Sequence, residues 1–245
     1  MLGFVHQVRD QSLRYGVGSA VRYFTSRIFD RVAGYQSYRG LVLPARNAPP
    51  FADRAANGVS CREVSLTELS CYTHDPAYDI SEQFLLEARL RGDCCIGVFD
   101  GPTLVSYSFN ASTPTNCDPL IHYEFSRGWI YHYKVFTLPE WRGQRLHGLQ
   151  VATLNREFGT HAGFKGLTSL VRTTNSSSLA SFKRLRFESA FHFAVVGKGQ
   201  RLRLVGHPFS KSVAFEEAGK ISFHVKDIDG TFSVVRIPAF TGESC

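Results

Sequence analysis

The alternation of apolar and polar residues divides most of the chain into short strands and helices. Apolar or alternating runs predict strands at residues 94–99, 104–109, 129–137, 167–172, 191–196 and 201–205. Helical spacing of apolar residues predicts helices at 79–90, 146–158 and 176–186, with Ser81 and Asn175 as N-caps of the first and last. This order predicts an α/β (α+β) fold with a mixed, mostly antiparallel central sheet and flanking helices.

The two ends of the chain have patterns of their own. Apolar residues at helical spacing, with arginines between them, predict one or two basic amphipathic helices over residues 1–45. A proline-containing linker follows at 46–58, the main domain at 59–206, and a C-terminal extension at 207–245 with a strand pair around Asp229-Gly230. The amphipathic helices suit either an anionic membrane surface or a docking site on the domain or on a second subunit.

Composition narrows the choice of partners. The chain has 28 Lys and Arg against 21 Asp and Glu, a net charge of +7. This charge favours anionic partners such as a phosphorylated cofactor, an acidic membrane or nucleic acid, although it can also serve solubility alone. The arginines are scattered and no nucleic-acid motif occurs, so nucleic acid ranks last. The sequence contains no Cys-x-x-Cys pair, so we do not expect a zinc knuckle. No apolar run reaches about 18 residues, so we expect a cytoplasmic protein whose membrane contact is at most peripheral.

The segment between the predicted strand at 129–137 and the following helix carries the clearest chemistry. It reads Leu-Pro-Glu-Trp-Arg-Gly-Gln-Arg-Leu-His-Gly over residues 138–148. A helix N-terminus exposes unpaired backbone N–H groups with partial positive charge. Gly143 permits close approach of the backbone, and Arg142 and Arg145 supply donors suited to phosphate oxygens. The turn therefore predicts a pyrophosphate site.

A second motif lies one strand and one helix further on. Asn175 is followed at fixed offsets by Ser178, Phe182 and Leu185-Arg186-Phe187. With Pro139, Arg142 and Gly143 in the turn, this spacing resembles the GNAT superfamily of acyl-CoA-dependent N-acyltransferases. The resemblance covers residues 59–205 and leaves both ends of the chain outside it.

The resemblance implies a co-substrate, acetyl-CoA or another acyl-CoA, and a reaction in which an amine attacks the thioester directly. It implies that the strand end pairs with the pantetheine arm and that the turn and helix start hold the pyrophosphate. The implied cofactor-binding residues are Val135, Phe136, Thr137, Arg142, Gly143, Gln144, Arg145, Leu146, His147, Gly148, Asn175 and Phe182. The acceptor would be a small-molecule amine or an amine on a glycoconjugate or lipid headgroup.

Three positions depart from the family pattern. Arg145 and His147 stand where relatives have small residues, and Phe182 stands where many have the tyrosine that reprotonates the leaving thiolate. Because phenylalanine has no proton to give, another group or water must do this. The alternative is a weakly active or inactive relative that acts as an acyl-CoA-binding or interaction module.

A base for the amine is less well defined than the cofactor site. Tyr131 and Tyr133 alternate along the predicted strand and so share one face, and Glu124 lies nearby in sequence, as do His122 and His132. Tyr131, Tyr133 and Glu124 are our candidate catalytic residues. The alternatives are aromatic packing for the tyrosines, solvated surface positions for the histidines and Glu124, and a water chain in place of a dedicated base.

Overall fold

The computed structural model describes residues 35–47, 58–118, 121–196, 203–207, 222–226 and 232–236. The amphipathic helices predicted near the start of the chain, most of the predicted linker and much of the C-terminal extension lie outside these residues. Within the described residues, no helix has the length and apolar content needed to cross a bilayer.

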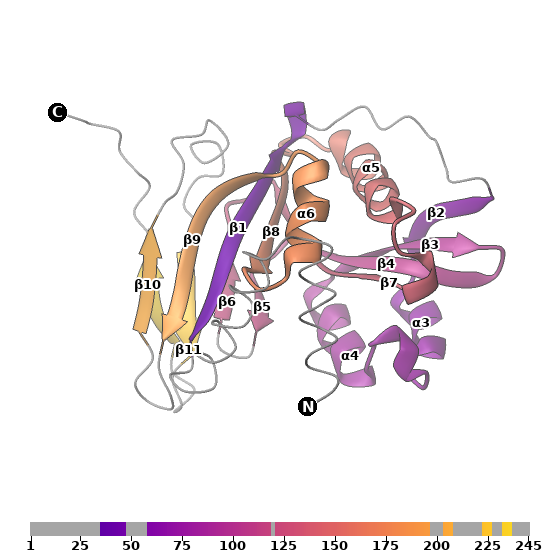
Figure 1. The fold of residues 1–245 in the computed structure, drawn as a ribbon, viewed down its shortest axis with the longest axis horizontal. Coiled ribbons are helices and arrows are strands. Elements are labelled where there is room, and N and C mark those ends of the chain that lie inside the picture. The colour runs from indigo at the N-terminus through magenta and orange to yellow at the C-terminus, as the bar shows by residue number, and fades with distance from the viewer. Residues whose placement is uncertain are drawn as a thin grey trace.

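The main sheet has eight strands in the order β10-β9-β1-β8-β7-β4-β3-β2 (Figure 1). Its strands are β1 (Gln36–Pro44), β2 (Val59–Val64), β3 (Cys94–Asp100), β4 (Thr103–Ala111), β7 (Trp129–Thr137), β8 (Gly166–Arg172), β9 (Glu188–Val196) and β10 (Arg203–His207). All neighbouring pairs are antiparallel except β7 and β8, which run parallel. The predicted mixed, mostly antiparallel sheet with flanking helices is confirmed.

Helices cover both faces of this sheet. On one face α5 (Leu146–Gly159) and α6 (Ser176–Arg184) enclose a mainly aliphatic core with β1, β7 and β8. On the other face the short α3 (Leu66–Leu69) and α4 (Glu82–Arg91) pack on β3 and β4. The predicted N-caps hold, because the Ser81 and Asn175 side chains accept hydrogen bonds from the backbone N–H groups of Phe84 and Ser178.

Strand β1 corrects the prediction for the start of the chain. Residues 36–44 were predicted to end a helical extension, but they form a strand between β8 and β9. Leu41, Val42 and Leu43 are all buried, because helices and strands cover both faces of the sheet there. A continuous apolar run is typical of such a central strand. Because the residues before it have apolar positions at helical spacing, the run was assigned to the same predicted helix.

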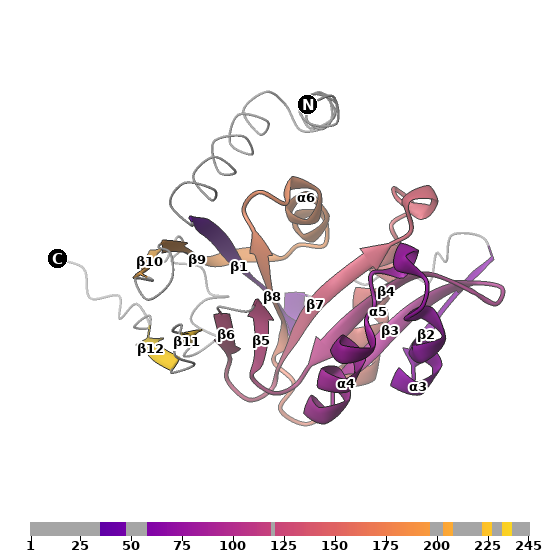
Figure 2. The same cartoon turned by 90° about the horizontal axis from the view of Figure 1, so that it is seen from below.

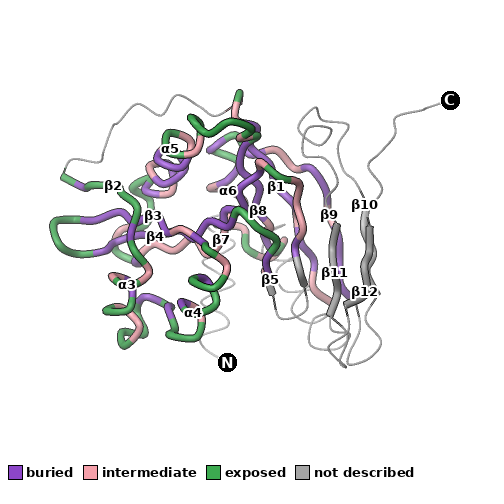
Figure 3. Tube along the Cα trace, turned by 180° about the vertical axis from the view of Figure 1, so that it is seen from behind, coloured by how far each residue is buried: buried purple, intermediate pink, exposed green. Residues whose placement is uncertain are grey.

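A smaller sheet has the order β12-β11-β6-β5. It contains β5 (Thr115–Asp118), β6 (Ile121–Glu124), β11 (Ser222–Lys226) and β12 (Phe232–Arg236). The strand pair predicted around Asp229-Gly230 is confirmed as β11 and β12, whereas β5 lies where a loop was predicted. The Tyr123 hydroxyl lies 2.6 Å from Oγ1 of Thr168, which joins β6 to β8. In Figure 3 the buried stretches lie mostly along the central strands of the main sheet.

Candidate active site

The two parallel strands, β7 and β8, separate soon after they begin. Only Trp129–Tyr131 pairs with β8, at Gly166–Thr168. The pairing of β7 with β4 contains a β-bulge, because Tyr107 pairs with Phe136 whereas Phe109 pairs with Tyr133, so that β7 has one extra residue. Lys134 lies in this bulge and has a left-handed φ of +44°. A bulge bends a strand, so it turns the end of β7 away from β8 (Figure 2). The first four residues of β7 are buried and the last five are partly exposed. We call the separation of β7 from β8 beyond their paired residues the opening.

The turn after β7 leads into an uncapped helix start. Pro139–Trp141 form a 3-10 turn, and α5 begins at Leu146. Arg145 occupies the N-cap with a left-handed φ of +61° and makes no side-chain capping hydrogen bond. Gly143 has a φ of +88°, and a Cβ placed there would meet no heavy atom within 4 Å. The first N–H groups of α5 therefore lack a side-chain cap from Arg145, beside backbone that is open to an approaching ligand.

Side chains tie this turn firmly to the end of β7. Nε of Arg142 donates to the Thr137 carbonyl at 3.2 Å. Oγ of Ser106 donates to the Phe136 carbonyl at 2.6 Å and accepts from Nε2 of Gln150 on α5 at 2.9 Å. Ser106 and Gln150 are buried, whereas Arg142 is exposed. The strand end and the helix start are thus one connected unit with an arginine at its surface.

The start of α6 lies at the carboxyl end of β8, as the start of α5 lies after the end of β7. Asn175 is exposed, and its amide oxygen accepts from the Ser178 backbone at 3.1 Å and from the Ser177 hydroxyl at 3.0 Å. In Figures 1 and 2, α6 lies over the region where β7 and β8 run apart. The starts of α5 and α6 thus follow the carboxyl ends of the two parallel strands.

A chain of polar side chains runs inward from α6, and the sequence did not reveal it. Ser181 Oγ lies 2.8 Å from Nδ1 of His147, and Nε2 of His147 lies 2.9 Å from Nε2 of His132. Nδ1 of His132 lies 2.7 Å from Oδ1 of Asn110. His132 was expected at the surface, but it is fully buried, because it alternates with Tyr131 and Tyr133 and faces the helices.

The positions of the hydrogens along this series of side chains follow from the orientation of the Asn110 amide at its buried end. Nδ2 of Asn110 donates to the Ser108 carbonyl at 3.2 Å, so the amide oxygen faces His132. His132 must then donate from Nδ1 and accept at Nε2, so that His147 donates from Nε2 and accepts at Nδ1. Ser181 completes the chain by donating its hydroxyl proton to His147.

Both imidazoles in this chain are neutral. Burial lowers the pKa of His132 well below its usual value, and the nearby His147 lowers it further. Burial, with the Arg184 cation second, lowers the pKa of His147 to about 3. The Phe182 ring, 3% exposed, meets both imidazoles edge-on at centroid distances of 4.8 and 5.9 Å. Phe182 thus packs against the histidine pair.

The two tyrosines chosen from the sequence as candidate catalytic residues lie on the other face of β7. The Tyr133 hydroxyl donates to Oδ2 of Asp93 at 2.6 Å and accepts from Arg91 at 3.1 Å. Tyr131 is buried and stacks on Tyr133 with ring centroids 5.1 Å apart. Burial raises the pKa of both tyrosines, and for Tyr133 the Asp93 carboxylate adds to the rise. Phenolate is therefore scarce at neutral pH, and the role of either tyrosine as a base stays a prediction.

Glu124 lies on β6 in the smaller sheet. Its neighbour Tyr123 packs on Tyr131, with ring centroids 4.9 Å apart. Successive side chains of a strand point to opposite faces, so Glu124 is directed away from Tyr131. The side chain of His122 lies outside the described part of the structure. The role predicted for Glu124 stays untested. Among the described residues, no group of three His, Cys, Asp or Glu is placed to hold a metal ion.

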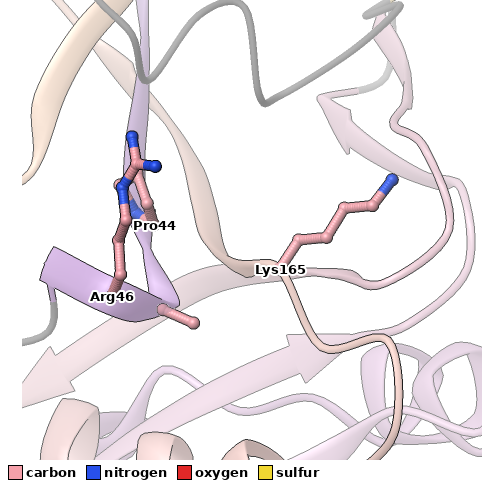
Figure 4. A pocket seen from close by; sticks show the side chains of 4 residues that line it. Pro44, Arg46 and Lys165 are labelled. Carbon is pink, nitrogen blue, oxygen red and sulfur yellow. The ribbon is translucent and has the colours of Figure 1, made fainter.

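A separate depression lies at the opposite ends of the parallel strands. It has a volume of about 310 Å³ and is lined by Pro44, Ala45, Arg46 and Lys165 (Figure 4). Lys165 directly precedes β8, and its carbonyl accepts from the Ala45 backbone at 2.8 Å. The depression is thus at the end of the strand pair where β7 and β8 are hydrogen-bonded, away from the opening.

Comparison with known proteins gives matches among solved structures. Several of these structures are GNAT acetyltransferases. No family model and no curated protein matches the sequence. A Drosophila protein is similar over 74% of this chain and 56% of its own, with 18% identity and a TM-score of 0.48. A tandem GNAT protein from the clavulanic acid biosynthesis pathway is similar over 77% of this chain and 72% of its own, with 14% identity and a TM-score of 0.48.

A putative GNAT-family acetyltransferase from Novosphingobium aromaticivorans is similar over 67% of this chain and 66% of its own, with 17% identity and a TM-score of 0.41. This chain spans little more than half the length of the Drosophila protein. All three TM-scores lie below 0.5, so the functional proposal rests on the site itself.

Proposed function

We propose that this protein is an acyl-CoA-dependent N-acyltransferase, in which a primary amine attacks the thioester directly. One observation carries the proposal. The opening between β7 and β8 ends at an uncapped helix start flanked by the exposed arginines Arg142 and Arg145. An elongated ligand with an anionic end fits this arrangement, and acyl-CoA has that form.

The pyrophosphate would lie at the start of α5. The backbone N–H groups of residues 144–147 would donate to its oxygens, and the open backbone at Gly143 would allow close contact. The N–H of Gly148, also predicted for this role, already donates to the Arg145 carbonyl at 2.8 Å. Nε of Arg142 donates to the Thr137 carbonyl, which orients the guanidinium and leaves its remaining N–H groups to donate to phosphate oxygens. Arg145 would add positive charge in place of the small residue that relatives carry.

The pantetheine arm would lie along the end of β7. In the described structure, β7 pairs with β8 only as far as Tyr131, so the edge of residues 132–137 facing β8 has no strand partner. The backbone of Val135, Phe136 and Thr137 would pair with the pantetheine amides there. A backbone N–H at the same edge would polarise the thioester carbonyl. Asn175, at the start of α6, would contact the arm.

The acceptor is proposed only by class, as a primary amine on a small molecule, a glycoconjugate or a lipid headgroup. A membrane-linked acceptor would agree with the basic amphipathic pattern of residues 1–45, which lie mostly outside the described residues. Liposome co-sedimentation with and without residues 1–35 tests that contact, and equal behaviour of the two chains would remove it. We choose residue 35 because β1 begins immediately after it.

A second function is favoured by Phe182. This residue has no acidic proton and is almost fully buried, so it cannot replace the tyrosine acid of relatives. The protein would then bind acyl-CoA without transferring the acyl group at an appreciable rate. Turnover measurements across a panel of amines separate the two functions, because only the first gives free CoA at a rate that depends on the amine.

Isothermal titration with acetyl-CoA and longer acyl-CoAs tests the shared cofactor site. We expect Arg142→Ala to weaken binding about 10- to 100-fold, since a charge-assisted hydrogen bond contributes about 1.5–3 kcal/mol. Arg156→Ala is the matched control, because Arg156 is exposed near the other end of α5 and pairs with Glu157. Absence of binding by the unaltered protein at millimolar acyl-CoA would refute the proposal.

A further inference from the structure

We propose that Ser181, His147 and His132 form a proton relay that takes the proton of the attacking amine and delivers it to the CoA thiolate. The proposal rests on the proposed function and names the groups that would replace the missing tyrosine acid. Ser181 directly precedes Phe182 on α6, so the hydroxyl lies one residue from the position where relatives carry the tyrosine.

The relay connects the three elements that bound the opening. His132 is the first residue of β7 beyond its pairing with β8, His147 is the second residue of α5, and Ser181 belongs to α6. Ser181 and His147 keep part of their surface exposed, whereas His132 and Asn110 are fully enclosed. This series of hydrogen-bonded side chains therefore runs from partly exposed residues on α5 and α6 to the interior of the protein.

The order of hydrogens sets the direction in which a proton can move. Ser181 donates to His147, His147 donates to His132, and His132 donates to Asn110. A proton that arrives at Ser181 Oγ displaces the hydroxyl proton onto Nδ1 of His147. The Nε2 proton of His147 then passes to Nε2 of His132. The positive charge ends on His132, where the Asn110 amide oxygen accepts one of its two N–H groups.

The reaction balances with this single proton. The amine nitrogen forms a bond to the thioester carbonyl carbon, the carbon–sulfur bond breaks, and the electron pair stays on the CoA sulfur. The amine proton enters the relay at Ser181, and the reverse shift returns a proton from Ser181 to the thiolate. The relay ends in its starting state, so one set of side chains acts as base and then as acid.

The surroundings of the imidazoles suit a transient proton holder. The groups that face them are Asn110 from β4, Phe182 and the Arg184 cation from α6, and the other imidazole. These surroundings keep both imidazoles neutral at rest, and Nδ1 of His147 and Nε2 of His132 are the acceptor nitrogens for an incoming proton. The protonated pair is disfavoured, so the proton is readily passed on to a thiolate.

The decisive test compares Ser181→Ala, Ser181→Thr and the unaltered protein. We expect Ser181→Ala to lower kcat at least 100-fold, with the Kd for acetyl-CoA by titration unchanged. Ser181→Thr keeps the hydroxyl and should restore most of kcat, which a purely structural role would not require. Lys183→Ala, at an exposed position on the same helix, is the control and should leave kcat unchanged.

The outcomes separate this proposal from the proposed function. Acetyl-CoA binding and amine-dependent turnover in the unaltered protein, with kcat unchanged in Ser181→Ala, would overturn the relay alone. Absence of acetyl-CoA binding would overturn the function and the relay with it. Nitrogen-15 NMR of the histidine side chains gives a readout without turnover. We expect the proton on Nδ1 of His132 and on Nε2 of His147, and the reverse arrangement would contradict the relay.

Discussion

The two faces of β7 hold hydrogen-bond networks of opposite character. On the face toward α4, Tyr133 joins an ion pair in which Arg91 lies 2.8 Å from the fully buried Asp93 carboxylate. On the face toward α5 and α6, His132 joins a chain of neutral groups. Neighbouring residues of one strand thus take part in a charged network and an uncharged one.

The two networks differ in what they can do: the charged one fixes side chains in place, whereas the neutral one can pass on a proton. Removing one partner from a buried ion pair leaves an unpaired charge, so the Arg91–Asp93–Tyr133 network is strongly held in one arrangement. The neutral side chains have no net charge to lose, and each imidazole donates from one nitrogen and accepts at the other. We infer that the charged face holds β7 in place, whereas the neutral face serves the chemistry.

The largest effect is expected on the charged face. Asp93→Ala should lower the free energy of unfolding by about 3 kcal/mol, because it removes the buried acceptor shared by Arg91 and Tyr133. Urea denaturation measures the change. Glu87→Ala is the matched control, since Glu87 pairs with the same arginine at 3.9 Å on the surface and should contribute only about 0.3–0.5 kcal/mol. Similar effects of the two substitutions would contradict the contrast between the networks.

A smaller effect is expected from pH on the neutral face. The pKa of His147 falls from about 6.5 in the unfolded chain to about 3 in the folded protein, so the unfolded state binds the proton more tightly. The stability from this residue is present above pH 6.5 and is lost as the pH falls toward 3. Since His147 keeps some solvent contact, the loss between pH 7 and pH 5 is at most about 2 kcal/mol.

Urea midpoints at pH 7, 6 and 5 measure this loss. Replacement of His147 by glutamine should flatten the dependence by the same amount, whereas Asp93→Ala should leave the contribution of His147 in place. An equal slope for the His147 variant and the unaltered protein would show that this imidazole is not held neutral by the fold.

Much of the fold could be predicted from the sequence, because its signals are local. The hairpin of β3 and β4 follows from two apolar runs around Asp100-Gly101, and the caps of α4 and α6 follow from Ser81 and Asn175. Strand β1 was missed because it enters the sheet between two strands that are more than 120 residues further along the chain. No local pattern encodes such a pairing.

The candidate site divides in the same way. The basic turn is continuous in sequence, so its glycine and arginines predicted a phosphate site directly. The relay joins Asn110, His132, His147 and Ser181, which are separated by 22, 15 and 34 residues. Each residue alone reads as an ordinary surface or strand position. The alternation of His132 with two tyrosines placed it opposite them, but only the packing of α5 and α6 on that face shows that it is buried.

The central claim is that the β7 end and the α5 start bind acyl-CoA, and amide NMR during titration with acetyl-CoA tests it most directly. We expect the largest shifts at the backbone N–H groups of residues 143–148 and of Val135, Phe136 and Thr137, with the amides of Ala45, Arg46 and Lys165 unchanged. Shifts confined to those three residues, or no shifts at millimolar acetyl-CoA, would contradict the claim.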